Sequence, residues 1–275
     1  MSSTSFQILS DLHLETHSSY DFPIKHTAAN LALLGDIGQV AHDGLFVFLE
    51  RQLKRYWNVV FILGNHEPYG TSWVLAKARV RAFEAKMHTL RESSTIGNFM
   101  FLDQGRWDVN ETLTVLGCTL FSNMSSQQGA EVERRLNDFR QIRDWAVEDH
   151  VSAHRSDLNW LNDQVEAISE TEPQRRIAVF SHYSPTLDKQ AVEPRHEDSP
   201  VSSAFATDLS QEQCWTNPAV VFWAFGHTHF NCDFTDKHGK RIIANQKGYA
   251  SALEADCNIG RVYSIAQGKV SGLLF

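Results

Sequence analysis

The sequence has few cysteines, no long apolar run and no leader-like N-terminus. Its 275 residues include 4 cysteines, which are far apart and form no CxxC pair, so neither a disulfide framework nor a thiolate metal site is expected. No apolar stretch reaches the ~20 residues that a membrane-spanning helix needs. The first residues, MSSTSFQILSDLHLE, contain no basic segment followed by an apolar one, so a secretory signal is not expected. Together these absences predict a cytoplasmic protein that does not enter a membrane.

Basic residues are also in deficit. The chain carries 25 basic and 33 acidic residues, which gives a formal net charge of −8. This balance argues against an extended nucleic-acid partner, because phosphate backbones are held mainly by Lys and Arg. It is compatible with a small phosphorylated substrate, since a bound metal ion would bring local positive charge that the count omits. What stands out in the composition is the number of histidines, 13.

Short apolar runs alternate with longer amphipathic segments along most of the chain. The runs are continuous and rich in Val, Ile and Phe, which is typical of parallel strands buried on both faces. We expect such strands at residues 6–9, 30–36, 58–64, 112–121, 176–182 and 219–227. We expect helices at 42–56, 71–95, 131–150 and 152–169. Thr71 or Ser72 is the expected N-cap of the second helix.

The last part of the chain has a different pattern. Residues 230–246 and 261–275 each contain strand-like segments joined at His-Gly or Gln-Gly, which predicts β-hairpins. The polar, proline-containing segment 184–215 predicts an irregular loop over one face. No repeat or linker divides the sequence. We therefore expect an α/β protein in which residues 1–275 form a single domain, with parallel strands first and antiparallel strands last.

Five of the expected strands end in residue types that bind metals. The residues in question are Asp11, His13, Asp36, Asn65, His66, Glu67, His182, His227 and His229. In an open α/β sheet, ligands bind in the crevice beyond the carboxyl ends of the strands. If these strands share one sheet, side chains up to 218 positions apart (229 minus 11) meet at one edge.

Spacing and donor type narrow the choice of metal. Asp11 and His13 are two positions apart, as are His227 and His229, so an extended backbone would point both side chains of a pair the same way. The candidates offer carboxylate oxygen, amide oxygen and imidazole nitrogen but no thiolate. This donor set suits Mn, Fe, Zn or Ni better than Ca or Mg. Seven ligands, with one carboxylate shared, suffice for two ions.

The order of the motifs resembles the signature of the calcineurin-like metallophosphoesterases. The matching motifs are Asp11-x-His13, Gly35-Asp36, Gly64-Asn65-His66-Glu67, His182 and Gly226-His227-x-His229. Segments such as LGCTLFSN and LNDFRQIRDW are similar to a subgroup of small, mostly uncharacterised phosphoesterases. The resemblance implies a four-layer α/β/β/α sandwich.

The resemblance also implies roles for these residues. The metal ligands would be Asp11, His13 and His229 for one ion, Asn65, His182 and His227 for the second, and Asp36 as the bridge. His66 would contact the substrate phosphate and protonate the leaving oxygen. Gly64 would let the chain turn, and Glu67 would support the ligands or fix the loop. No residue is assigned to an organic cofactor.

The activity implied is hydrolysis of a phosphoester at a dinuclear centre of divalent or trivalent ions, by a hydroxide that bridges them. A small phosphodiester is the favoured substrate. Two alternatives stay open, namely a phosphomonoesterase of the same mechanism and an inactive scaffold that the metals only brace. A nuclease is opposed by the net charge of −8. The sequence indicates no oligomeric state.

Overall fold

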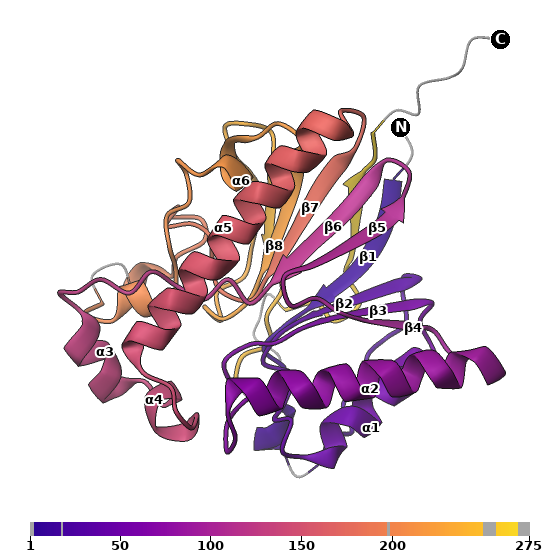
Figure 1. Ribbon diagram of the computed structural model, residues 1–275, viewed down its shortest axis with the longest axis horizontal. Coiled ribbons are helices and arrows are strands. Elements are labelled where there is room, and N and C mark those ends of the chain that lie inside the picture. Colours follow the sequence, from indigo (N-terminus) through magenta and orange to yellow (C-terminus); the bar gives the residue numbers. More distant parts are fainter. Residues whose placement is uncertain (1–2, 18, 197–198, 250–256, 269–275) are drawn as a thin grey trace.

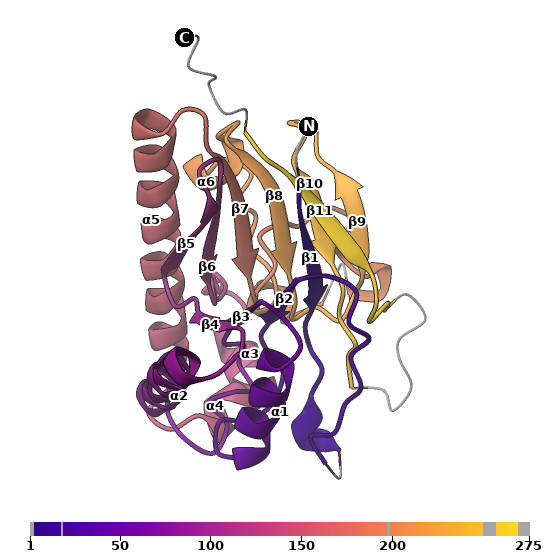
Figure 2. The same ribbon diagram turned by 90° about the vertical axis from the view of Figure 1, so that its right-hand side faces the viewer.

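Two β-sheets lie face to face in the computed structural model shown in Figures 1 and 2, and helices cover the outer face of each sheet. The structure describes residues 3–17, 19–196, 199–249 and 257–268. The layers therefore run helix, sheet, sheet, helix. This confirms the predicted α/β fold with four layers.

The first sheet has five strands in the order β11–β1–β2–β3–β4. Strands β1 to β4 are parallel to one another, and the edge strand β11 runs antiparallel to β1. The bounds are Ser3–Leu9 for β1, Asn30–Leu34 for β2, Asn58–Ile62 for β3, Asn98–Phe101 for β4 and Val262–Ala266 for β11. The first strand of the chain is thus an interior strand that pairs with β11 at the other end of the sequence.

The second sheet has six strands in the order β5–β6–β7–β8–β10–β9. Its four inner strands are parallel, and the edge strands β5 and β9 are antiparallel. The bounds are Gly105–Asn110 for β5, Leu113–Cys118 for β6, Arg176–Ser181 for β7, Val220–Phe225 for β8, Cys232–Thr235 for β9 and Arg241–Ala244 for β10. Strands β9 and β10 confirm the first predicted hairpin. The second lies partly outside the described residues, which include its first strand as β11.

The central strands bury both of their faces. Alternate residues such as Phe6, Ile62 and Phe180 pack between the two sheets, where the rings of Phe6 and Phe180 meet edge to face at 5.6 Å. The residues between them in sequence, such as Phe61 and Val179, join the core beneath the helices. Burial on both sides explains why these strands appear in the sequence as continuous apolar runs.

Two helices cover each sheet. Helices α1 (Asp43–Leu53) and α2 (Trp73–Ser93) lie on the first sheet, and α5 (Val147–Thr171) and α6 (Gln213–Thr216) lie on the second (Figures 1 and 2). Ser72 is the N-cap of α2, and its hydroxyl accepts the N–H of Leu75 at 3.4 Å. In the described part of the chain, no helix combines the length and apolar character that a bilayer crossing requires.

The predicted helix over residues 131–150 is wrong. The chain instead forms α3 (Gly129–Arg135) and α4 (Asp138–Gln141) before α5 begins. Leu136 and Ile142, which follow these short helices, have extended backbone with ψ of 139° and 123°. The break brings Asp138 into the interior, where it contacts Asn65.

The strand ends that carry the candidate ligands come from both sheets, which corrects the expectation of a single sheet. Strands β1, β2 and β3 belong to the first sheet, whereas β7 and β8 belong to the second. Because the sheets are stacked with these ends at the same edge of the sandwich, the side chains still converge (Figure 2).

Candidate metal centre

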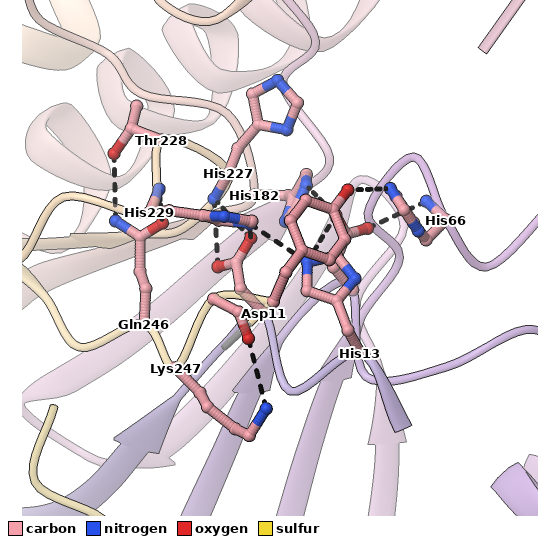
Figure 3. A network of polar contacts seen from close by, with 12 residues as sticks. Asp11, His13, His66, His182, His227, Thr228, His229, Gln246 and Lys247 are labelled. Atoms are coloured by element: carbon pink, nitrogen blue, oxygen red, sulfur yellow. Dashed lines mark hydrogen bonds and ion pairs between the residues drawn. The ribbon is translucent and has the colours of Figure 1, made fainter. Parts of the chain in front are cut away.

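The seven side chains predicted as metal ligands lie together at one edge of the sandwich. Asp11 and His13 follow β1, Asp36 follows β2, Asn65 follows β3, His182 follows β7, and His227 and His229 follow β8. The side chain of His229 is 26% exposed, and the other six residues are buried. Several of these side chains point toward a common centre in Figure 3.

The backbone at these strand ends is strained. Asp11, His13, Asp36, His227 and His229 have left-handed backbone, with φ of 54°, 46°, 53°, 71° and 52°. The expectation of extended backbone in the two pairs is therefore wrong. A non-glycine residue in a sparsely populated region costs on the order of 1–3 kcal/mol, and such residues gather at functional sites. The sharp bends redirect the side chains just where the ligand positions begin.

One group of donors consists of Asp11, His13 and His229, whose ligand atoms all lie within 4.8 Å of one another. The Nε2 atoms of His13 and His229 are 3.0 Å apart, and Nε2 of His229 is 3.3 Å from Oδ1 of Asp11. The backbone N–H of His227 donates to both oxygens of Asp11, at 3.1 Å each. These contacts fix the carboxylate while its neighbours converge on one point.

A second group consists of Asp36, His182 and His227, again within 4.8 Å of one another. The Nε2 atom of His182 is 3.5 Å from Oδ2 of Asp36 and 3.1 Å from Oδ1 of Asn65. The same Asp36 oxygen is 3.9 Å from Nε2 of His13 in the first group. Asp36 therefore lies between the two groups.

The charges of these side chains suit a cation. Burial alone would raise the pKa of Asp11 and Asp36, but His229 beside Asp11 and His182 beside Asp36 outweigh it, so both pKa values lie below the usual range. Burial and the neighbouring charge of His182 hold the pKa of His227 well below its usual range. The two carboxylates are thus ionised at neutral pH and the imidazole of His227 is neutral, as metal coordination requires. Burial lowers the pKa of His182, but the carboxylate of Asp36 outweighs burial and raises the pKa to about 9, so this imidazole would release a proton on binding a metal ion.

One of the eight buried side-chain atoms without a hydrogen-bond partner in the described residues belongs to a candidate ligand. The Nε2 atom of His227 is buried and has no hydrogen-bond partner among the described residues, although buried polar atoms are nearly always paired. Its ring is held between Tyr183, at a centroid distance of 4.0 Å, and Phe205, at 5.0 Å. A metal ion would satisfy this lone pair, so the residues present fit a metal centre with nitrogen and oxygen donors.

Gly64 is required for space. It precedes Asn65, and a Cβ atom on it would lie 2.2 Å from Oδ1 of Asp36 and 2.6 Å from Cε1 of His182. Gly35, by contrast, is required for its left-handed backbone, with φ of +85°. Any side chain at Gly64 would therefore displace Asp36 and His182, two members of the second donor group.

His66 lies beside both groups and makes contacts at each ring nitrogen. Its Nδ1 is 2.9 Å from Oε1 of Glu15, and its Nε2 is 2.8 Å from the hydroxyl of Tyr249. Its ring stacks on Tyr69 at 4.3 Å. Burial lowers the pKa of His66, but the carboxylates of Asp36 and Glu15 outweigh burial and raise the pKa to about 9. His66 therefore carries a proton on each ring nitrogen at neutral pH.

Glu15 is a site residue that the sequence reasoning missed. Its Oε1 accepts hydrogen bonds from Nδ1 of His13 at 3.2 Å and Nδ1 of His66 at 2.9 Å. Burial raises the pKa of Glu15, but the bonds from these two histidines outweigh it and lower the pKa to about 2. Such a carboxylate orients the imidazole of a metal ligand and fixes its tautomer. Its position two residues after His13 was the available signal.

Asp138 is a second missed residue. The side-chain amide of Asn65 donates to Oδ1 of Asp138 at 2.9 Å and to the hydroxyl of Tyr69 at 3.4 Å. Tyr69 also donates to Oδ1 of Asp138. These bonds use the amide nitrogen, so the amide oxygen is the atom that faces His182 and the second group of donors. The signal in the sequence was the segment LNDFRQIRDW, which contains Asp138.

Glu67 joins two strand-end loops. Its buried carboxylate accepts the backbone N–H groups of Asp36 (3.0 Å), Ile37 (2.7 Å), Gly38 (3.3 Å) and Gly64 (2.6 Å). All four donors belong to the loops after β2 and β3. Of the two roles expected for Glu67, the structure shows the loop-fixing one.

A cleft of about 740 Å³ opens from the donor groups. At its inner end are Asp36, Asn65, His66, His227 and His229. Much of its outer wall comes from the polar segment predicted as a loop, whose residues between 187 and 206 line it. This segment contains two short 3-10 helices, Pro194–His196 and Ser202–Ala204. The predicted loop over one face is therefore confirmed.

Comparisons with known proteins identify the family of the chain. The sequence profile described as calcineurin-like phosphoesterase matches residues 5–231. An uncharacterised protein, L509, of Acanthamoeba polyphaga mimivirus is 24% identical over 261 residues, which cover 88% of this chain and 90% of that protein.

Solved structures share the fold. A phosphopantetheinyl hydrolase from Mycobacterium tuberculosis superposes with a TM-score of 0.63 at 14% identity, and the superposition covers 90% of this chain and 90% of that protein. A dimetal phosphatase from Danio rerio has a TM-score of 0.50 at 12% identity and covers 88% of this chain and 86% of its own.

Replacing Glu67 by Gln tests the link between the two loops. The amide NH₂ would face backbone donors and leave at least one of them unpaired, so we expect the free energy of unfolding to fall by about 2–4 kcal/mol. Urea denaturation measures this change. Glu92→Gln on the exposed surface of α2 is the control, with an expected change within about 0.5 kcal/mol. An unchanged midpoint for Glu67→Gln would contradict the role.

Replacing Asp138 by Ala tests the orientation of the Asn65 amide. We expect the affinity of the second donor group for Mn²⁺ to fall by roughly 10- to 100-fold, because the amide is no longer held. The first donor group contains neither Asn65 nor its partners, so its affinity should hold. Calorimetric titration of the metal-free protein measures both sites. The exposed Asp163→Ala serves as the control, and two unchanged affinities in Asp138→Ala would refute the assignment.

Proposed function

Because the chain belongs to the calcineurin-like phosphoesterase family and is a metal-dependent hydrolase of phosphoric esters, we propose that it cleaves a small phosphodiester at the strand-end cluster. The observation that supports this most directly is the convergence of two groups of buried oxygen and nitrogen donors, with Asp36 between them. The match to the family runs from residue 5 to residue 231 and therefore includes every candidate ligand, from Asp11 to His229.

We assign Asp11, His13 and His229 to one metal ion and Asn65, His182 and His227 to the second, with Asp36 shared. Two sets of donor atoms that lie within 4.8 Å of one another, Asp11–His13–His229 and Asp36–His182–His227, support this division, and a third set joins His66 to His13 and Asp36. The orphaned Nε2 of His227 supports its role as a ligand. Two such ions would neutralise charge on the phosphoryl oxygens and lower the pKa of a water molecule so that it can act as the nucleophile. Mn, Fe, Zn and Ni all accept this donor set.

His66 is the proposed general acid. Glu15 accepts the proton on Nδ1, so the proton on Nε2 is the one available for transfer. Nε2 of His66 is 2.8 Å from the hydroxyl of Tyr249, which lines the cleft. We propose that a substrate oxygen would occupy the position of this hydroxyl. A positioned acid that protonates the departing oxygen contributes about 10²- to 10⁴-fold in rate. The backbone N–H of His66 donates to Asp36 at 2.8 Å, which fixes the residue beside the donors.

The negative charge supports a small substrate over an extended nucleic acid. The scattered cysteines support a cytoplasmic location. The shared core between the sheets supports one domain over residues 1–275. A phosphomonoester is the second candidate substrate. Because the Mycobacterium tuberculosis structure is named a phosphopantetheinyl hydrolase, a phosphopantetheinyl ester should be tested as well.

Metal removal and reconstitution test the activity. We expect the chelated protein to be inactive and to recover hydrolysis of bis(p-nitrophenyl) phosphate with one of Mn²⁺, Fe²⁺, Zn²⁺ or Ni²⁺, and to hydrolyse p-nitrophenyl phosphate more slowly. Metal content by mass spectrometry should be two ions per chain. Asp36→Asn should lose both ions. Faster monoester cleavage would reverse the diester preference, and no hydrolysis with any ion would contradict the proposed activity.

His66→Ala tests the general acid. We expect both metal ions to remain bound, and kcat to fall by about 10²- to 10⁴-fold for an alkyl leaving group. The loss should be smaller for p-nitrophenolate, because this leaving group needs less protonation. His238→Ala, an exposed histidine far along the chain, is the control. Loss of a metal ion in His66→Ala would show instead that His66 is a ligand.

A further inference from the structure

We propose that the cleft beyond the metal centre binds an extended, apolar organic group of the substrate. The inference deepens the proposed phosphoesterase function and rests on it. It names the substrate class as phosphoesters that carry an aliphatic or aromatic chain, as opposed to nucleotides or sugar phosphates. The cleft is the feature that carries the inference.

The cleft is continuous with the metal centre and is much larger than a phosphate group requires. One cavity of about 740 Å³ contains both the donor residues and the outer walls. Ligand pockets that bury most of a drug-sized molecule measure about 300–1,000 Å³. A phosphate held at the donor groups would therefore direct its organic substituent along the cleft.

The walls of the outer cleft are largely apolar. The apolar residues that line it are Leu136, Leu187, Val192, Val201, Phe205 and Ala206. The side chain of Leu187 is 53% exposed, which is a cost for a large apolar residue unless a ligand covers it. Apolar walls with a few polar groups at one end are typical of sites that orient a ligand by its polar head.

The apolar wall of the cleft is held by packing and by a hydrogen bond to a neighbouring loop. Leu136, Val201 and Phe205 pack on a small apolar cluster of their own, formed by Met124, Val132 and Ala204. This segment is also tied to the loop after β6, since the N–H of Asn123 donates to Thr207 at 2.8 Å. The cleft is thus formed before a ligand arrives, which reduces the cost of binding.

The two arginines at the rim of the cleft are paired with carboxylates, so they do not form a site for a second phosphate group. Arg135 lines the cleft but pairs with Glu131, and Arg195 pairs with Glu193 at 2.6 Å. Lys189 also lies at the rim and is exposed. With the two arginines balanced by carboxylates, the apolar walls decide which substituent fits. This separates the proposed substrate from polyanions such as dinucleotides.

Binding of alkylphosphonic acids tests the proposal without relying on turnover. These compounds carry the tetrahedral head group but cannot be hydrolysed as esters. Isothermal titration of the metal-loaded full-length protein would compare methyl-, butyl-, hexyl- and octylphosphonic acid. We expect the Kd to fall by roughly three- to fourfold for each methylene that the cleft buries.

A matched pair of variants locates the effect. Leu187→Ser removes an exposed leucine inside the cleft, and Leu75→Ser removes one of similar exposure (51%) on α2. We expect octylphosphonic acid to bind about 10-fold more weakly to Leu187→Ser and with unchanged affinity to Leu75→Ser. The two sites are both on the surface, so neither change should prevent folding.

The outcomes separate this inference from the proposed function. Equal Kd values for methyl- and octylphosphonic acid, together with hydrolysis of bis(p-nitrophenyl) phosphate, would overturn the cleft proposal and leave the activity standing. Absence of both binding and hydrolysis would overturn the activity and the cleft proposal with it. A concentration-dependent dimer that Leu187→Ser dissociates, with no dependence on chain length, would show that a second copy covers the wall and would also overturn the proposal.

Discussion

The site depends on keeping two carboxylates, Asp11 and Asp36, buried and ionised. An isolated charge in a protein interior is very costly, so each needs nearby donors. The backbone N–H of His227 donates to both oxygens of Asp11, and that of His66 donates to Asp36. These bonds require the next motif to approach closely, and glycine makes the approach possible. A Cβ on Gly226 would lie 2.7 Å from Oδ2 of Asp11. The bends at the strand ends and the glycines around them thus follow from one electrostatic requirement.

Three further acidic residues hold the donors in place, each by a different kind of partner. Backbone N–H groups bind Glu67, two imidazoles bind one oxygen of Glu15, and an amide and a phenol bind one oxygen of Asp138. Because these carboxylates are buried and paired, the ligand atoms are oriented before an ion binds. A preorganised set of this kind loses little conformational entropy on binding. The carboxylates of Glu15, Asp11 and Asp36, whose pKa values are all lowered, concentrate negative charge at the strand ends, where a cation or a phosphate with its cations is the complementary partner.

Local features of the sequence predicted the buried strands and the polar residues after them, because a continuous apolar run and its last residues are properties of one segment. The left-handed backbone at Asp11 or His227 could not be predicted, since contacts with distant parts of the chain impose it. Asp138 lies 73 positions from Asn65, and its segment LNDFRQIRDW, although similar to segments of small phosphoesterases, does not indicate which residue Asp138 contacts. The helix predicted over 131–150 failed for the same reason, because apolar spacing does not show where tertiary contacts interrupt a helix. Strands β4 and β5 were not predicted; β4 has only four residues, and β5 is an edge strand whose residues are half-buried or exposed.

The position of β1 has a consequence for biosynthesis. His13 follows this strand and meets His229, 216 positions later, and β1 itself pairs with β2 on one side and β11 on the other. A growing chain therefore cannot complete the first donor group until residue 229 has left the ribosome, and cannot close the first sheet until residues 262–266 have emerged. Contacts this far apart in sequence form late in folding. An ion that needs all three donors of the first group could therefore be bound only after residue 229 has emerged.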